Sequence, residues 1–379
     1  MKIYFFFILC LLSFSCSRKP EARESKTDTH KLTLSRQKLV LPIDDSTSFE
    51  SNYFQVIEDR GIELLAVESK HKNSIQFYSL ESKKLVKELK FSRQGLSPIK
   101  QIHGFSWINS DSIMVFDKWR SNGILVDSNG LVLDQIVLKA EEKSFNHASM
   151  TRLPDLAING KLYFFEFPNI DLEEERLFSG EVKFEYVYDI KTKKGEYLNF
   201  SWPDIYKGKF WGFYHTFPSR VRGQNNSLVY SFGIDHNLQV LKPNGTIEQH
   251  EARSNYFNSI PPVDKHESES ESFLKRGVYA MMIYDKYREV YYRIAGLQTD
   301  PIFPDGKPKA DIYKPYSIII LDSKFNRIGE TVLEPVEQFL IKDWFVCNAG
   351  LCISSANPLN KEVDESKMTF HILTLDKIE

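Results

Sequence analysis

The amino-acid sequence predicts an all-β protein, a six-bladed β-propeller built from four-stranded antiparallel blades. After residue 30 the chain is a long series of short apolar or alternating runs separated by turn residues, and almost none of it keeps a helical period. The runs fall into groups of four, and each group spans about forty residues, which is the size of a propeller blade. Aromatic residues make up 13% of the chain, a content that favours strands.

The clearest group lies in the first third of the chain. Its expected strands are 101–108, 112–117, 123–127 and 131–138. Asn129 and Gly130 join the last two strands, and both residue types tolerate the positive φ angles of a tight hairpin. This group therefore predicts one complete blade.

The same pattern recurs along the chain. The other complete blades are expected at 53–59, 63–68, 74–80 and 84–91; at 153–157, 161–167, 184–190 and 195–200; at 216–221, 227–233, 238–242 and 246–251; and at 278–284, 290–295, 316–322 and 327–333. A pair of β-sandwiches and a seven-bladed ring are the rival arrangements.

The final group has only three strands. They are expected at 338–344, 350–354 and 369–375. Residues 31–41 form a strand without a blade of its own. We expect this N-terminal strand to complete the last blade, because that would close the ring and remove an open sheet edge.

The N-terminus is expected to lie outside the fold. Lys2 precedes an apolar run, residues 3–12, that is too short to span a bilayer as a helix, and small residues then lead to Cys16. This pattern is typical of a lipoprotein signal peptide, residues 1–16, with Cys16 as the acylated residue; a plain secretory peptide is the alternative. Residues 17–30 are dense in charge and predict a disordered tether, so the propeller domain would span 31–379.

These features predict a location in the cell envelope. Ser17 follows Cys16, where some bacteria use Asp to retain a lipoprotein at the inner membrane, so the outer membrane is favoured. The net charge is −2, which leaves no basic excess to hold nucleic acid. The expected partners are the membrane, through the lipid anchor, and a glycan, a peptide or an envelope protein.

Three short segments suggest a family. Residues 91–98 (FSRQGLSP), 111–115 (DSIMV) and 126–130 (VDSNG) resemble lipid-anchored six-bladed propellers of Bacteroidota, closest to the domain-of-unknown-function family labelled 4221. The resemblance covers most of the chain. It implies the fold and the envelope location, and it brings no catalytic residues with it.

An aromatic cluster in the connection between the third and fourth blades is the first candidate for ligand binding. It consists of Trp202, Phe210, Trp211, Phe213 and Tyr214. Exposed aromatic side chains can stack on sugar rings or anchor a partner. The alternative is that they pack into the core or plug the propeller axis. The charged run at 263–276, further along, predicts a solvated loop.

Basic residues near the starts of the innermost strands form two further candidate sets. Arg152, Arg220 and Arg222 would suit a carboxylate or phosphate ligand. His103, His147 and His215 could hold zinc, and calcium is the other metal considered, although we expect no cofactor. A polar lining of the channel is the simpler interpretation of both sets.

Two cysteines remain in the domain. A turn at Ala349 and Gly350 would set Cys347 directly opposite Cys352, close enough for a disulfide in an oxidising compartment. Two buried thiols are the alternative.

No conventional catalytic motif is present in the sequence. It contains no Ser-His-Asp elbow, phosphate-binding Gly loop or paired zinc-ligand motif. We therefore expect a binding or scaffolding protein without catalysis. The alternative is a metal-dependent propeller hydrolase or lyase with its site at the channel mouth, where Asp155 could join the histidines. A purely structural envelope protein is a third possibility.

Overall fold

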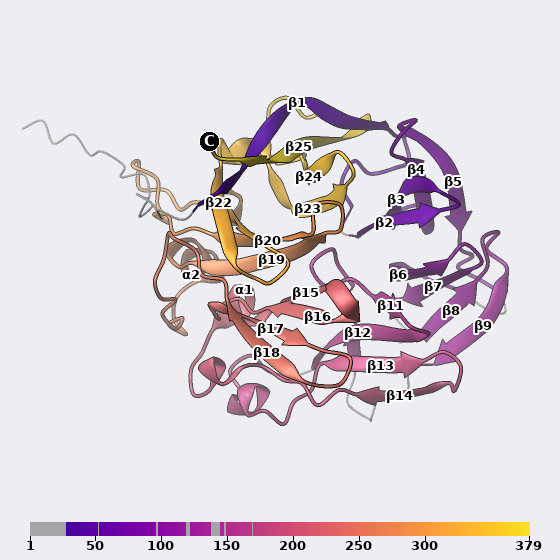
Figure 1. The fold of residues 1–379 in the computed structure, drawn as a ribbon, viewed down its shortest axis with the longest axis horizontal. Coiled ribbons are helices and arrows are strands. Elements are labelled where there is room, and N and C mark those ends of the chain that lie inside the picture. The colour runs from indigo at the N-terminus through magenta and orange to yellow at the C-terminus, as the bar shows by residue number, and fades with distance from the viewer. Residues whose placement is uncertain are drawn as a thin grey trace, which may run out of the picture.

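The computed structural model describes residues 28–51, 53–95, 98–118, 122–137, 145–147, 149–168 and 170–379. The predicted signal peptide, Cys16 and residues 17–27 of the tether lie outside this part of the chain. Six antiparallel sheets are arranged in a ring around a central axis, as the sequence predicts (Figure 1). No helix in the described ranges is long and apolar enough to cross a membrane.

Each blade is a sheet whose strands follow one another outward from the axis in chain order, except that the outermost strand of blade 6 is the first strand of the chain. Blade 1 consists of β2 (Phe54–Asp59), β3 (Ile62–Ser69), β4 (Ser74–Ser79) and β5 (Lys84–Lys90). Blade 2 consists of β6 (Ile102–Asn109), β7 (Ser112–Asp117), β8 (Asn122–Val126) and β9 (Val132–Val137). Blade 3 consists of β11 (Leu156–Ile158), β12 (Lys161–Pro168), β13 (Glu185–Asp189) and β14 (Lys194–Tyr197), with β10 (Phe145–His147) also paired to β12.

The second half of the chain continues the ring. Blade 4 consists of β15 (Ser219–Arg222), β16 (Leu228–Ser231), β17 (Asn237–Leu241) and β18 (Ile247–Glu251). Blade 5 consists of β19 (Val278–Asp285), β20 (Val290–Gly296), β21 (Tyr316–Leu321) and β22 (Arg327–Leu333). Blade 6 consists of β23 (Leu340–Cys347), β24 (Gly350–Ser354), β25 (Lys367–Lys377) and β1 (His30–Pro42).

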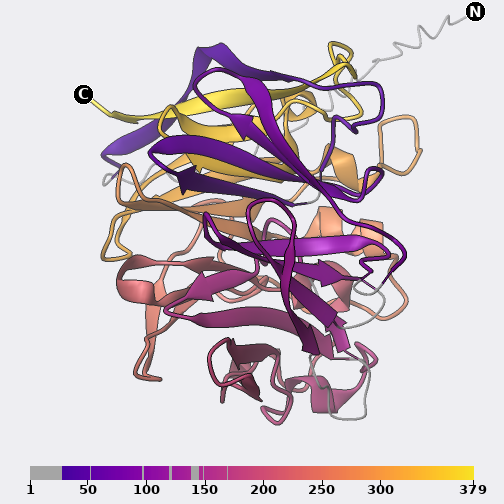
Figure 2. The same cartoon turned by 90° about the vertical axis from the view of Figure 1, so that its right-hand side faces the viewer.

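Strand β1 closes the ring. It pairs with β25 from Pro42↔Lys367 to His30↔Lys377, so the first and last strands of the domain lie side by side (Figures 1 and 2). The expected closure is confirmed. Strand β1 begins at His30 and not at residue 31, and the backbone carbonyl of Thr29 accepts from the Ile378 N–H at 2.9 Å.

The blades pack face to face through apolar side chains. The strands β3, β4, β20 and β24 are buried along almost their whole length, because each lies inside its own blade and also faces the neighbouring blades. The largest apolar cluster lies between blades 3, 4 and 5 and is rich in phenylalanine and tyrosine. This packed ring is a rigid frame for the loops at each end of the channel.

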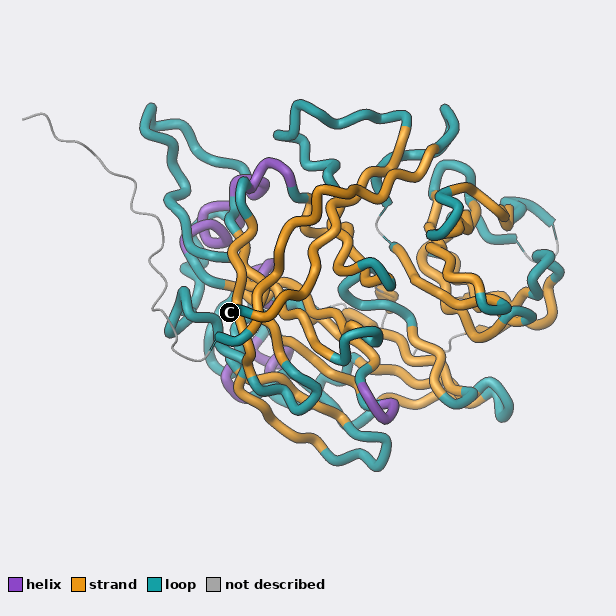
Figure 3. Tube along the Cα trace, turned by 45° about the horizontal axis from the view of Figure 1, so that its top comes forward, coloured by secondary structure: helices purple, strands orange, loops and turns teal. Residues whose placement is uncertain are grey.

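Short helices occur in the connections between strands and lie outside the sheets (Figure 3). They are η1 (Glu175–Phe178), η2 (Asp204–Tyr206), α1 (Gly212–Thr216), η3 (Gln224–Asn226), α2 (Glu269–Lys275), η4 (Asp311–Tyr313) and η5 (Val336–Gln338). The expectation of a solvated loop at 263–276 is therefore wrong for its second half, where residues 269–275 form α2. Helix α2 forms there because Ser268 caps it by accepting from the Glu271 N–H, and because its apolar residues Phe273 and Leu274 are buried.

Candidate binding site at the mouth of the channel

A pocket of about 480 Å³ lies at one end of the central channel, and we call it the mouth pocket. All six blades or the segments that enter them contribute to its wall, which places it on the propeller axis. It lies on the end formed by the blade-to-blade connections and the second-to-third strand loops, next to the starts of the innermost strands. The lining residues are Lys70, His103, Ser149, Met150, Thr151, Arg152, Phe213, Tyr214, Phe273, Val278, Ala280, Met281, Tyr316, Ile341 and Lys342.

The mouth pocket combines an apolar wall with positive charge. Lys70, His103, Arg152 and Lys342 line it, whereas no carboxylate occurs among the described lining residues. A volume of this size is typical of a site for a small ligand. The pocket is therefore suited to a small molecule that carries both an apolar body and a negative charge.

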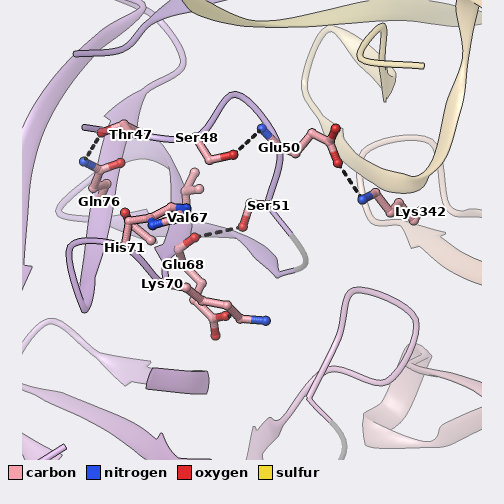
Figure 4. Close-up of a pocket in the computed structure, with 11 residues that line it drawn as sticks. Thr47, Ser48, Glu50, Ser51, Val67, Glu68, Lys70, His71, Gln76 and Lys342 are labelled. Atoms are coloured by element: carbon pink, nitrogen blue, oxygen red, sulfur yellow. Dashed lines mark hydrogen bonds and ion pairs between the residues drawn. The ribbon is translucent and has the colours of Figure 1, made fainter. Parts of the chain in front are cut away.

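Two of the basic groups at the rim already have acidic partners in a smaller, polar pocket of about 230 Å³ (Figure 4). Lys342 donates to Glu50 at 2.6 Å, and the ammonium of Lys70 lies 3.5 Å from the carboxylate of Glu68. Both lysines line the two pockets and so separate one from the other. Their charges are largely compensated before any ligand arrives.

Arg152 differs from these lysines. Its Nε is buried without a hydrogen-bond partner, and the structure gives its guanidinium no ion pair within the described ranges. The guanidinium carbon lies 5.0 Å from the centre of the Phe217 ring, which supports it from one side. Burial lowers the pKa of Arg152 to about 10, so the group stays charged at neutral pH. The pocket thus contains a fixed cation without a counter-ion among the described residues.

Phe213, Tyr214 and Phe273 form an aromatic wall of the mouth pocket, and this wall is held in place by contacts outside the pocket. The Tyr214 ring stacks on Phe273 with 4.2 Å between ring centres, and its hydroxyl bonds to the carboxylate of Asp311. Lys314 lies behind Phe273 and is fully buried. Its ammonium donates to the carbonyls of Phe273, Arg276 (2.8 Å) and Leu297 (3.1 Å), and burial lowers its pKa well below the usual value. Phe273 and Lys314 were not predicted as site residues.

The structure divides the predicted aromatic cluster. Phe213 and Tyr214 line the mouth pocket. Trp202 and Trp211 are buried in the core, where their indole N–H groups donate to the carbonyls of Thr216 (2.9 Å) and Tyr206 (3.1 Å). The expectation that both tryptophans are exposed is therefore wrong.

Phe210 lies apart from the mouth pocket. It lines a separate hollow of about 130 Å³, where the Lys265 ammonium lies 5.7 Å from its ring centre. Only two of the five predicted aromatic residues therefore meet at one site.

The predicted arginines are divided as well. Arg220 is buried between blades, where it forms an ion pair with Glu185 and donates to the carbonyl of Pro154, so it faces no ligand. Arg222 is exposed at the opposite end of the channel and donates to the Asn226 side chain. The expectation is therefore wrong for Arg220, whereas Arg222 lines a different pocket and only Arg152 reaches the mouth pocket.

The three predicted metal ligands have different surroundings. His103 lines the mouth pocket, whereas His215 is buried and does not, and the side chain of His147 lies outside the described part. Burial together with the charges of Lys314 and Arg276 lowers the pKa of His215 to about 3. In the described part of the chain no group of three or more His, Cys, Asp or Glu side chains is placed to hold a metal ion.

Asp155 lies inside the ring rather than in the mouth pocket. Its side chain is fully buried, and burial raises the pKa of its carboxyl well above the usual value. Its backbone N–H donates to the Tyr53 hydroxyl at 3.0 Å, so the segment that enters β11 is bonded to the segment that enters blade 1.

Cys347 and Cys352 are free thiols, both buried, with 3.5 Å between their sulfur atoms. The expected register is wrong, because Cys347 pairs with Gly350 and Cys352 pairs with Phe345. Gly350 belongs to β24 and not to the turn: its φ is +149°, and a Cβ there would lie 2.4 Å from the Leu373 carbonyl oxygen. The two cysteines are consequently diagonal neighbours and not a directly opposed pair.

The fold and the mouth pocket define a class of protein: a six-bladed β-propeller with a ligand-sized pocket at one end of its channel. A family described as "Domain of unknown function (DUF4221)" matches residues 30–332. The chain belongs to this family, which confirms the resemblance seen in the sequence.

Solved structures agree with the fold. A member of the DUF4221 family from Bacteroides vulgatus has a TM-score of 0.82 at 22% identity, with 93% of this chain and 100% of that chain covered. A proposed exported protein from Bacteroides fragilis has a TM-score of 0.55 at 9% identity, with 95% and 98% covered. Virginiamycin B lyase from Staphylococcus aureus, with a TM-score of 0.43 and 11% identity over 91% and 100% of the two chains, is too different to inform on activity. A search of the curated proteins found no match.

Proposed function

We propose that this protein is an envelope lipoprotein that binds a small ligand in the mouth pocket and does not transform it. The observation that carries the proposal is the pocket itself, which is apolar, sized for a ligand, and supplied with a half-buried arginine, Arg152, that has no ion pair among the described residues. Binding sites in proteins commonly combine an apolar wall with a few convergent polar groups. The scaffolding of a glycan, peptide or protein partner in the envelope is the broader form of this proposal.

The envelope location rests on the N-terminal sequence. An apolar run that ends at Cys16 supports export and acylation, and one protein of similar fold is itself a proposed exported protein. An acylated Cys16 would place the pocket next to a membrane, at the outer membrane if Ser17 acts as in other bacteria. Radiolabelled palmitate incorporated into the full chain, and lost in Cys16→Ala, would support this part of the proposal.

The binding proposal is tested by filling the pocket. Ala280 lines the mouth pocket, so Ala280→Trp would place an indole where a ligand body would lie. Full-length protein in lipid nanodiscs is incubated with the small-molecule fraction of the organism's envelope, and the retained compounds are identified by mass spectrometry. We expect the original protein to retain a compound that Ala280→Trp does not.

The matched control is Leu131→Trp, which adds the same side chain at a position that is 66% exposed and outside the pocket. It should retain the compound. If Ala280→Trp retains the compound as well as the original protein does, the ligand binds outside the mouth pocket and the proposal is wrong. A retained compound that is recovered in altered form would favour a hydrolase or lyase instead.

A further inference from the structure

The charges around the mouth pocket point to one kind of ligand. Four basic side chains line the pocket and no described lining residue is acidic, so a ligand cation would find no partner there. The apolar wall, which includes Phe213, Phe273 and Met281, excludes a ligand that is polar throughout. The chemistry that fits is a compact apolar body with a single anionic group.

The anionic group of the ligand should bind beside the cation of the pocket that has no acidic partner. Lys342 and Lys70 are engaged by Glu50 and Glu68. Arg152 has no such partner within the described part of the chain, and its buried Nε cannot be reached by solvent. The terminal nitrogens are consequently the part of the guanidinium left to face the pocket.

Arg152 is also held in position before a ligand binds. Its guanidinium rests on Phe217, whose ring stacks on Phe167 with 4.5 Å between centres. The Arg152 carbonyl accepts from the Arg220 N–H at 2.8 Å and from the Ser219 hydroxyl at 3.0 Å, so the backbone is fixed too. A guanidinium held in this way loses little freedom when it binds, and its planar pair of N–H groups matches the two oxygens of a carboxylate.

Tyr316 supplies a possible second contact. It lines the same pocket, it raises the pKa of Arg152 electrostatically, and its hydroxyl has no hydrogen-bond partner among the described residues. The hydroxyl of Tyr214 is already bonded to Asp311, so it is less available. A carboxylate at Arg152 could therefore accept a further hydrogen bond from Tyr316.

We propose that the mouth pocket selects a small organic acid, whose carboxylate pairs with Arg152 and Tyr316 and whose apolar body packs on Phe213, Phe273 and Met281. This inference rests on the proposed binding function and names its ligand class. It adds a requirement that the binding function alone does not make, namely that the ligand carries a carboxylate.

The experiment compares acids with amides of the same shape. The probes are phenylacetate, 3-phenylpropanoate and 2-naphthylacetate, each beside its neutral primary amide. Full-length protein in nanodiscs is titrated by calorimetry, with empty nanodiscs as the blank. We expect at least one acid to bind roughly tenfold more tightly than its amide, because a charged hydrogen-bonded pair is formed only with the acid.

Variants assign the preference to Arg152. Arg152→Gln should lower the affinity for the acid to that for the amide, while the affinity for the amide stays unchanged and so reports that the pocket is intact. Arg152→Lys should recover part of the preference. Tyr316→Phe should lower the affinity for the acid about threefold, as expected for one lost hydrogen bond. Arg222→Gln, at the opposite end of the channel, is the control and should change nothing.

The outcomes separate the two proposals. If acids and amides bind equally well and Ala280→Trp abolishes both, the pocket binds ligands but the acid requirement is wrong. If an acid binds preferentially and Arg152→Gln does not reduce the preference, Arg152 is not its partner. If no probe binds at millimolar concentration, the acid inference is overturned, and retention of envelope compounds then decides the binding function by itself.

Discussion

The two ends of the channel are alike in composition and different in how their charges are satisfied. The mouth pocket and a pocket of about 440 Å³ at the opposite end share Thr151 in their walls, and both contain basic and aromatic side chains without a described acidic one. At the opposite end Arg222 is exposed and bonded to the Asn226 side chain, the Tyr287 hydroxyl is bonded to Glu63, and the exposed Lys286 lies 4.9 Å from the centre of the Tyr287 ring. At the mouth Arg152 has no such partner in the described part of the chain. The comparison teaches that a cation that is shielded from solvent and has no partner among the described residues, more than the presence of a charge, distinguishes a candidate site.

The largest expected effect is on stability and separates the fully buried Arg220 from the half-buried Arg152. Arg220→Leu should lower the free energy of unfolding by about 3–5 kcal/mol, because it leaves the carboxylate of Glu185 buried without its partner. Arg152→Leu should cost about 1 kcal/mol or less, because the contact that it loses is with the Phe217 ring. Denaturant unfolding of both variants measures the difference. Similar losses would mean that Arg152 is a structural residue like Arg220.

The second prediction concerns a carboxyl group beneath the mouth. Asp343 is buried, neither of its side-chain oxygens has a hydrogen-bond partner among the described residues, and burial raises its pKa from 3.8 to about 7. A raised carboxyl pKa means that the folded state holds its proton longer than the unfolded state. Stability should therefore fall as the pH rises from about 4 to 7.

The variant Asp343→Asn removes this titration. It should be more stable than the original protein by roughly 2–4 kcal/mol at pH 8 and differ little at pH 4. Melting curves across this pH range provide the measurement. A stability difference that does not change with pH would rule out Asp343 as the titrating group.

A smaller effect is expected behind the aromatic wall. Lys314→Met removes the donor that satisfies three buried carbonyls, so it should lower the free energy of unfolding by about 1–3 kcal/mol. It should also weaken binding of both the acid and the amide probes, because Phe273 loses its support. Lys309→Met, on the exposed loop nearby, is the control. Unchanged binding of both probes would show that Lys314 does not position the wall.

The smallest effect tests whether the opposite end can be made to resemble the mouth. Asn226→Gly removes the side chain that engages Arg222, and glycine accepts the φ of +60° at this position. The freed guanidinium is exposed, so it should add only a weak second site for the acid probes, seen as a shallow late phase after the first site is saturated. A second site as strong as the first would show that burial of Arg152 is unimportant.

The sequence predicts the ring well because blades repeat a local pattern. Runs such as 112–117 alternate or stay apolar over the length of one strand, and Asn129 and Gly130 mark a turn without help from distant residues. The unpaired segment 31–41 was sufficient to predict the closure by β1. These features depend on neighbours in the chain, so the sequence displays them directly.

The site depends on contacts between blades, which no local pattern displays. Arg152 and Arg220 occupy comparable sequence positions near inner strands, yet Glu185, a residue of another strand, decides which of them is paired. Trp211 and Phe213 are two residues apart, and one is in the core while the other faces the pocket. A capping signal, Ser268 three residues before Glu271, could have revealed α2 and with it Phe273.

The pairing of β1 with β25 also sets the order of events when the chain folds. The first strand of the domain to be made finds its partner only when residues 367–377 are present, so the ring cannot close while the chain is still emerging from a ribosome or crossing a membrane. Until then blade 6 has an open edge, and β1 has no strand to pair with. A chain that ended before β25 would keep five blades and lose its closure, and we expect such truncated chains to be removed by proteolysis and not to accumulate.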